Sequence, residues 1–381
     1  MSKVRLGDLF SISSGGTPNK KNPEYYINGD IPWIKTGDLK GKYISNEIEY
    51  ITEDGLINSS AKIFPRNTVL VAMYGATIGA CSILPFDAST NQACAAFLPN
   101  DRVIPEYLYY FLCSKKEKFI QDGVGGAQPN ISAGYLKKVE IEELSLNQQK
   151  QIAATLDKVT DLINKRKQQL EKLDELVKAR FVEMFGGISD SKRYPYKAVK
   201  ELTDVISGGT PSREVSEYWE GGTIPWVKTT ELQNNIITEI DEYVTEAGLD
   251  NSSAKLVPAG TVLIAMYGQG KTRGMTGYLG VEACTNQACA CILPSDSINQ
   301  RFLWKFFVLS YDNLRDMAKG GNQPNLNGNI IKNYPVLCPP RELQEQFAAF
   351  VEKTDKSKQQ IQQSLEKLET LKKSLMQEYF G

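Results

Sequence analysis

The sequence contains no histidine among its 381 residues. Histidine is the commonest general base near neutral pH, and it completes the Ser-His-Asp and Cys-His groups of many hydrolases. Those two kinds of nucleophilic catalysis are therefore excluded. The seven cysteines include no C-x-x-C pair, so no zinc site is expected. Scattered, unpaired cysteines instead indicate reduced, buried thiols in a cytoplasmic protein.

Long hydrophobic runs are also scarce. No apolar stretch follows Lys3 and Arg5, so a secretory signal is not expected. The uncharged window 68–86 is about as long as a membrane span, but it contains Gly75, Gly79 and Pro85. We interpret it as a buried strand with a glycine-rich loop, and we predict no membrane contact.

The chain also lacks an excess of positive charge. Residues 1–147 carry 15 Lys and Arg against 16 Asp and Glu, and residues 187–341 carry the same balance. This excludes a non-specific polycation that binds nucleic acid through charge alone. It does not exclude DNA binding through a local basic face on an otherwise acidic domain.

What the chain does have is an internal repeat. SGGTP occurs at residues 14 and 207, IPW-[IV]-K-T at 31 and 224, NSSAK at 58 and 251, and TVL-[VI]-AMYG at 68 and 261, all 193 residues apart. TNQACA, QPN and LEKL recur 195 residues apart, so one two-residue insertion separates the copies. Two similar units can be related by a pseudo-twofold axis, which suits the local twofold of B-form DNA and its paired half-sites.

Each copy is predicted to be a mixed globular part followed by a long helix. Residues 68–74 and 91–98 resemble short strands, and residues 105–121 and 302–319 resemble helices. Residues 148–185 lack glycine and proline, and Ser145 with Gln148 fits a capping box. Its apolar stripe, at heptad-like spacing, comprises Ile152, Leu156, Val159, Ile163, Leu170, Leu173, Val177 and Met184.

The second long helix, 342–379, has a complementary stripe. The first helix carries Arg166 and Arg180 where the second is apolar, and the second carries Lys358 and Lys372 where the first is apolar. We therefore expect the two helices to face each other, antiparallel, in one molecule, with the globular parts at opposite ends of the pair. The alternative is that each helix docks only on its own globular part.

Motifs that resemble catalytic or nucleotide-binding sites do not match fully. The loop G-Q-G-K-T at residues 268–272 has Ala265 where a phosphate-binding loop needs glycine. We interpret Lys271 and Arg273 instead as a cationic loop for a phosphate or a base edge, with a solvated loop as the alternative. No N/D-P-P-aromatic methylation motif occurs. D-L-K at 38–40 becomes E-L-Q at 231–233, so we interpret both as helix- or turn-starting polar residues rather than a nuclease site.

The repeated polar motifs remain as candidates for recognition. Asn and Gln amides can contact adenine bidentately, and Lys can contact guanine or a phosphate. The alternative for the QPN loops is a turn in which the amides bind their own backbone. Trp33 and Trp226 are expected in the core.

In the order and duplication of these motifs, the chain resembles the specificity subunits of type I restriction–modification systems over essentially its whole length. The resemblance implies an α+β fold with two pseudo-twofold-related mixed α/β target-recognition domains, 1–147 and 187–341. Two long antiparallel coiled-coil helices, 148–186 and 342–381, would separate them. It implies a non-catalytic reader of double-stranded DNA that recognises two half-sites across a fixed gap set by the helices.

The resemblance also implies partners. Two modification subunits would bring S-adenosylmethionine and adenine methylation, and restriction subunits would bring ATP-driven translocation and cleavage with magnesium. No cofactor, metal or catalytic residue is expected on this chain. The candidate DNA-binding residues are Thr17, Lys20, Lys35, Thr36, Lys62, Tyr74, Gln128, Asn130, Thr210, Arg213, Lys228, Thr229, Lys255, Tyr267, Lys271, Arg273, Gln323 and Asn325.

Two other functions compete with this interpretation. One is a protein–protein scaffold whose duplicated domains bind two copies of a partner and no DNA. The other is a fragment of a single-chain enzyme whose catalytic domain lies elsewhere.

The two copies are more alike than is usual in the family, which suggests related half-sites, with loop 268–274 as a source of asymmetry.

Overall fold

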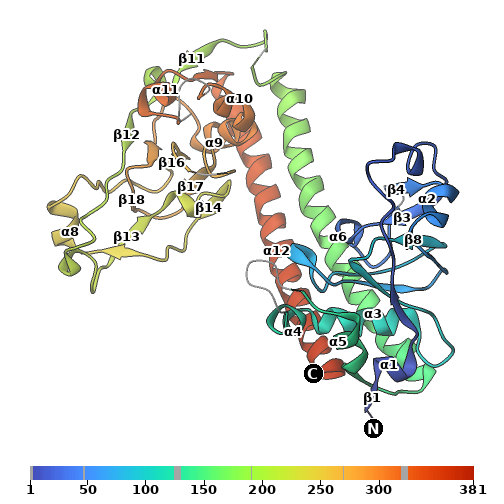
Figure 1. The fold of residues 1–381 in the computed structure, drawn as a ribbon. Coiled ribbons are helices and arrows are strands. Elements are labelled where there is room, and N and C mark those ends of the chain that lie inside the picture. Colours follow the sequence, from blue (N-terminus) through green and yellow to red (C-terminus); the bar gives the residue numbers. More distant parts are fainter. Residues whose placement is uncertain (1–2, 46–47, 124–129, 190, 269, 319–324) are drawn as a thin grey trace. The chain divides into compact units, whose positions relative to one another are not determined.

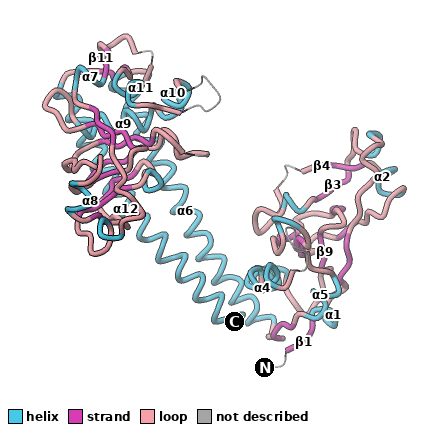
Figure 2. The backbone as a smooth tube through the Cα atoms, turned by 60° about the vertical axis from the view of Figure 1, so that its left-hand side comes forward, coloured by secondary structure: helices cyan, strands magenta, loops and turns pink. Residues whose placement is uncertain are grey.

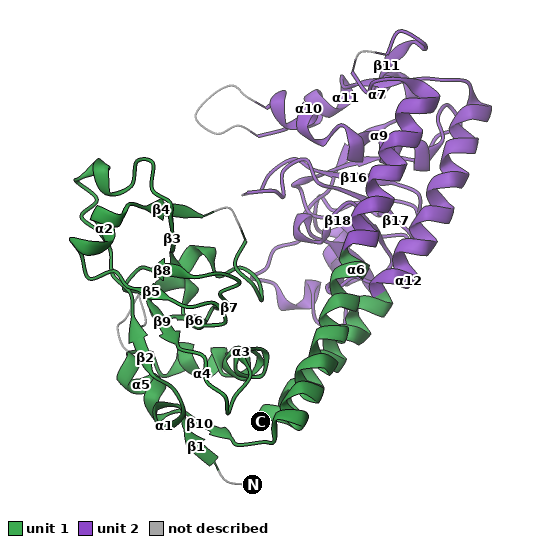
Figure 3. Ribbon diagram, turned by 90° about the vertical axis from the view of Figure 1, so that its right-hand side faces the viewer, with its two compact units in different colours: residues 1–167, 363–381 green, residues 168–362 purple. Residues whose placement is uncertain are grey.

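The computed structural model describes residues 3–45, 48–123, 130–189, 191–268, 270–318 and 325–381. The chain divides into two compact units, coloured separately in Figure 3. Unit 1 comprises residues 1–167 and 363–381, and unit 2 comprises residues 168–362. Each unit therefore contains the globular part of one copy of the repeat together with a segment of both long helices.

The strands of unit 1 form a central sheet of order β2-β9-β6-β7 and a second sheet of order β4-β3-β8-β5. The central sheet is antiparallel, whereas β3 and β8 of the second sheet run parallel. A short pair, β1-β10, lies beside them. The bounds are β1 (Lys3–Arg5), β2 (Ile12–Ser14), β3 (Ile31–Ile34), β4 (Glu49–Ile51), β5 (Ile63–Phe64), β6 (Val69–Ala72), β7 (Cys81–Ile83), β8 (Ala88–Thr90), β9 (Cys94–Phe97) and β10 (Glu140–Glu142).

Unit 2 repeats this arrangement with one strand more in its central sheet and one fewer in its second sheet. Its central sheet has the order β12-β19-β16-β17-β14, its second sheet β15-β13-β18, and its short pair β11-β20. The equivalent parallel pairing joins β13 to β18. The bounds are β11 (Tyr196–Ala198), β12 (Val205–Ser207), β13 (Ile224–Val227), β14 (Asn235–Ile237), β15 (Tyr243–Val244), β16 (Val262–Ala265), β17 (Thr276–Leu279), β18 (Cys284–Thr285), β19 (Cys289–Ile292) and β20 (Pro335–Leu337).

Short helices connect and cover these sheets, as the cyan and magenta segments of Figure 2 show. In unit 1 they are α1 (Leu6–Leu9), η1 (Pro23–Tyr25), η2 (Thr36–Asp38), α2 (Glu53–Ile57), η3 (Gly75–Thr77), α3 (Pro105–Ser114), α4 (Lys116–Gln121) and α5 (Ala133–Lys138). In unit 2 they are α7 (Val199–Leu202), η4 (Ser216–Tyr218), η5 (Thr229–Glu231), α8 (Glu246–Asp250), α9 (Gln300–Leu309), α10 (Tyr311–Asp316) and α11 (Gly328–Lys332).

The predicted strands at 68–74 and 91–98 are confirmed as β6 and β9, and window 68–86 is strand and loop rather than a membrane helix. No helix in the described part of the chain is long and apolar enough to cross a bilayer. The predicted helices at 105–121 and 302–319 are each divided in two. The backbone of Lys115 and of Ser310 leaves the helical range, with ψ of 2° and 9°.

The central strands are buried on both faces. Along β6, Val69 and Val71 pack in the cluster beneath α3, while Leu70 packs in the cluster beneath the second sheet. The same alternation in β16 places Val262 and Ile264 against α9, and Leu263 on the opposite face. Because successive side chains of a strand point to opposite faces, these continuous apolar runs are typical of a sheet between two layers.

The two long helices are α6 (Leu146–Phe185) and α12 (Arg341–Phe380), each 40 residues and so about 60 Å long. The predicted capping box is confirmed, since the Ser145 backbone N–H donates to Gln148 Oε1 at 3.1 Å. A buried glutamine anchors each helix start to its globular part. Gln149 accepts from the Ile104 N–H, and Gln344 accepts from the Asn299 N–H.

Within each unit, the helix segments pack antiparallel (Figure 1). In unit 1, Lys167 pairs with Glu369 at 3.0 Å, while Leu156 and Phe380 share one core. In unit 2, Lys358 pairs with Asp174, and the rings of Phe181 and Phe347 lie 5.5 Å apart. The predicted antiparallel pairing is therefore confirmed. The sequence-derived stripe omitted Phe181 and Phe185, which are fully buried.

Candidate nucleic-acid interface

In unit 1, four of the repeated motifs pack against one another. An added Cβ at Gly15 would lie 2.0 Å from the Thr90 carbonyl oxygen, and one at Gly16 would lie 2.3 Å from Ser60. Trp33 is fully buried, and its Nε1 donates to the Gly16 carbonyl at 3.0 Å. The motifs SGGTP, IPWIKT, NSSAK and TNQACA are therefore repeated in part because the fold needs them in contact.

The equivalent motifs of unit 2 pack against one another in the same way. Trp226 Nε1 donates to the Gly209 carbonyl at 3.0 Å, and an added Cβ at Gly209 would lie 2.3 Å from the Ala254 nitrogen. The expectation that both tryptophans belong to the core is confirmed.

We expect Gly16→Ala and Gly209→Ala each to destabilise the chain by about 3 kcal/mol, because the new methyl group would meet backbone that cannot retreat. Urea unfolding followed by fluorescence would measure the loss. Gly37→Ala is the matched control, since its Cβ would meet nothing within 4 Å. Equal stability of all three variants would contradict this packing.

A row of polar side chains, here called the polar edge, borders the four packed motifs in each unit. In unit 1, Thr17 Oγ1 donates to Gln92 Oε1, and Tyr74 forms a β-bridge with Asn130. The backbone of Met73 joins these pairs, because its N–H donates to the Ala93 carbonyl and its carbonyl accepts from the Ile131 N–H. We define Thr17, Tyr74, Gln92 and Asn130 as the polar edge of unit 1.

The polar edge of unit 2 consists of Thr210, Tyr267, Gln287 and Asn325. Thr210 Oγ1 donates to Gln287 Oε1, and Met266 binds the backbone of Ala288 and Leu326 as Met73 binds its own neighbours. Tyr74 and Tyr267 are 44% and 40% exposed, so both edges face solvent. Gln128 and Gln323, also predicted to contact DNA, lie outside the described residues.

Sequence reasoning missed Gln92 and Gln287, which are exposed and accept hydrogen bonds from Thr17 and Thr210. The signal was present, because both belong to the repeated TNQACA motif. Their exposed amides have the chemistry to contact an adenine edge.

Several predicted cationic contacts are paired with carboxylates inside their own unit. Lys35 pairs with Glu49, and Glu242 pairs with Lys228 at 2.6 Å and with Arg213 at 2.5 Å. Hydrogen bonds from Lys228 and Arg213 lower the pKa of Glu242. Arg213 also stacks on Trp219, its guanidinium carbon 3.6 Å from the ring centroid. These cations are thereby partly neutralised.

The remaining candidates separate into exposed and half-buried groups. Lys20, Lys62, Lys255 and Lys271 are exposed. Thr36 and Thr229 are half-buried at the starts of η2 and η5.

Asp38 and Glu231 serve as capping residues. Their carboxylates accept the backbone N–H of Lys35 at 2.8 Å and of Lys228 at 2.9 Å. The two carboxylates thus cap the starts of the short helices η2 and η5, although Asp38 and Glu231 are themselves the last residues of these helices. In the described part of the chain, no group of three or more Cys, Asp or Glu is placed to hold a metal ion.

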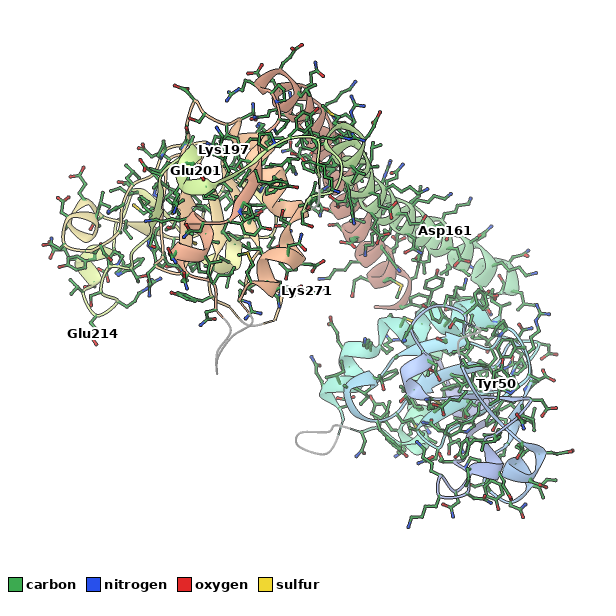
Figure 4. All side chains as sticks on the ribbon, turned by 90° about the horizontal axis from the view of Figure 1, so that it is seen from above. Tyr50, Asp161, Lys197, Glu201, Glu214 and Lys271 are labelled. Atoms are coloured by element: carbon green, nitrogen blue, oxygen red, sulfur yellow. The ribbon has the colours of Figure 1, made fainter. Side chains whose placement is uncertain are left out.

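The two-residue insertion lies in the hairpin between β16 and β17. We call Gly268 and residues 270–274 the Lys271 loop. The Gly274 N–H closes it by donating to the Ala265 carbonyl at 2.8 Å. A strand follows rather than a helix, so it is not a phosphate-binding loop of the usual type. Lys271 is exposed at the rim of the globular part of unit 2 (Figure 4).

The sequence of this chain matches a known protein family. The model of the type I restriction modification DNA specificity domain matches residues 1–172 and 192–370. The chain belongs to this family. It is 27% identical over 372 residues to the type I restriction enzyme MjaIX specificity subunit of Methanocaldococcus jannaschii, covering 91% of this chain and 85% of that protein.

Other specificity subunits are also similar to this chain. The EcoprrI specificity subunit of Escherichia coli is 23% identical over 377 residues, covering 92% of this chain and 86% of that protein. The crystal structure of an S subunit from M. genitalium shares the fold, with a TM-score of 0.63 at 17% identity, over 100% of this chain and 96% of that one.

Proposed function

We propose that this specificity subunit recognises a bipartite double-stranded DNA target. Residues 1–147 contact one half-site, residues 187–341 contact the other, and helices 148–186 and 342–381 set the gap. The observation that carries the proposal is the duplicated polar edge, in which Thr, Tyr, Gln and Asn side chains recur at equivalent positions of both units. Such side chains can contact base edges and phosphates.

The subunit itself is non-catalytic in this proposal. Two modification subunits supply S-adenosylmethionine and methylate adenine, and restriction subunits supply ATP- and magnesium-dependent cleavage. Membership of the DNA specificity family does not favour the alternative function, a protein–protein scaffold that does not bind DNA.

The Lys271 loop offers the sharpest test, because only unit 2 carries the insertion. We expect Lys271→Ala and Arg273→Ala to alter recognition of the unit 2 half-site only. A lost base contact should cost about 1–3 kcal/mol and relax one position, whereas a lost phosphate contact should weaken binding to all sequences alike. Methylome sequencing of a host expressing the variant with its modification subunits measures the motif, and a binding titration measures affinity.

Lys197→Ala is the matched control, since Lys197 is an exposed lysine of the same unit that Figure 4 shows away from Lys271. If both loop variants leave affinity and motif unchanged, the loop does not contact DNA. If they alter the half-site of unit 1, the assignment of half-sites to units is wrong.

A further inference from the structure

Helix α10 holds the backbone of the Lys271 loop. Tyr311 Oη donates to the Lys271 carbonyl at 2.7 Å, and Arg315 Nη1 donates to the Arg273 carbonyl at 2.8 Å. Arg315 Nη1 also donates to Tyr311 Oη at 2.9 Å, so the two side chains brace each other. The loop is thus held at two carbonyl groups, which leaves the exposed Lys271 side chain available for an outside partner.

The loop also rests directly on these two side chains. Gly274 has φ of +86°, which glycine adopts without strain. A Cβ added there would lie 3.1 Å from Arg315 Cγ and 3.5 Å from two ring carbons of Tyr311. The close approach of the loop to the helix therefore requires a glycine at position 274, and the side chains of Tyr311 and Arg315 form the surface on which it packs.

Helix α10 is itself fixed to the core of unit 2. Leu314, between the two bracing residues, is fully buried in the main cluster with Phe306 and Phe307. Tyr311 and Arg315 are half-buried. Because the helix is anchored by its apolar face, its polar side chains hold the loop in one position.

Unit 1 lacks the longer loop and the Tyr–Arg pair that holds it. Its equivalent hairpin, between β6 and β7, is two residues shorter, and the equivalent helix positions are Lys116 and Ile120. Isoleucine cannot donate a hydrogen bond, and the Lys116 stem packs against Gly79, with Cγ 2.9 Å from an added Cβ. The longer loop and its two donors therefore occur together in one copy.

We propose that Tyr311 and Arg315 are positioning residues that determine the base specificity of the unit 2 half-site by fixing the Lys271 loop. This inference rests on the proposed function, in which unit 2 contacts that half-site. Neither side chain needs to contact DNA, because each acts through a loop carbonyl.

The test uses the full chain with Tyr311→Phe, Arg315→Met and the double variant. Proteolysis of a folded segment requires local opening, so the rate at which trypsin cleaves after Lys271 or Arg273, followed by mass spectrometry, measures how firmly the loop is held without DNA. Losing hydrogen bonds of this kind should raise the cleavage rate about tenfold in the double variant. Methylome sequencing of hosts that carry the same variants with their modification subunits should show relaxed base identity in the unit 2 half-site alone.

Lys116→Met, at the equivalent position of unit 1, is the control and should leave both readouts of unit 2 unchanged. An unchanged cleavage rate would overturn the proposal, and so would faster cleavage with an unchanged motif. Tyr311→Phe removes a single oxygen, so it keeps the test valid if the double variant does not fold. If Lys271→Ala and Arg273→Ala change the motif but the α10 variants do not, only this inference fails. If none of them changes it, the proposed role of the loop fails as well.

Discussion

Four residues inserted into each long helix should lengthen the gap between the two half-sites by one or two base pairs. The insertion extends an α-helix by about 6 Å, and B-form DNA rises about 3.4 Å per base pair. Both half-sites should keep their base identities, because neither polar edge changes. Methylome sequencing of a strain that carries the insertion reports the gap and the half-sites together.

The insertions belong where the chain passes from one compact unit to the other, between Lys167 and Gln168 in α6 and between Gln362 and Gln363 in α12. A site just before Gln148 would be unsuitable. There the buried Gln149 amide bonds the carbonyls of Arg102 and Leu144, so an insertion would break the anchor of unit 1. Leu156 also packs in the core of that unit.

The control replaces four residues at each position with the inserted sequence, without a change in length, and should leave the gap unchanged. An unchanged gap with intact methylation after insertion would show that the helices do not set the spacing. Altered bases within a half-site would show that the helices also shape the surface that contacts DNA.

Lys305→Met should destabilise the chain by about 3–5 kcal/mol, because it leaves a mostly buried carboxylate without its partner. Lys305 on α9 pairs with Asp355 on α12 at 3.1 Å, and their side chains are 7% and 16% exposed. Burial lowers the pKa of Lys305, although Asp355 opposes this shift. The pair thus joins the globular part of unit 2 to a long helix at a considerable desolvation cost.

The double variant Lys305→Met/Asp355→Leu should recover most of the lost stability, since replacing both charges by apolar groups removes the unpaired ion. Urea unfolding of the wild type, both single variants and the double variant gives the coupling energy. A double variant as unstable as Lys305→Met would show that packing, rather than charge pairing, dominates this contact.

The sequence by itself determined the duplication, the two long helices and the position of the insertion. These are properties of local pattern: repeated motifs at a constant spacing, apolar residues at heptad-like intervals, and a spacing that changes from 193 to 195 residues at one hairpin. The antiparallel packing of the helix segments was also predictable, because each helix is polar where the other is apolar.

Only the tertiary structure decided which side chains meet. Thr17 and Gln92 are 75 positions apart in the chain, and Tyr311 and Lys271 are 40 apart, and no periodicity links such pairs. Lys35 and Lys228 looked like available cations until folding placed Glu49 and Glu242 beside them. Hydrogen bonds and ion pairs depend on distances of a few ångströms, which are set once strands and helices from distant segments have packed into one core.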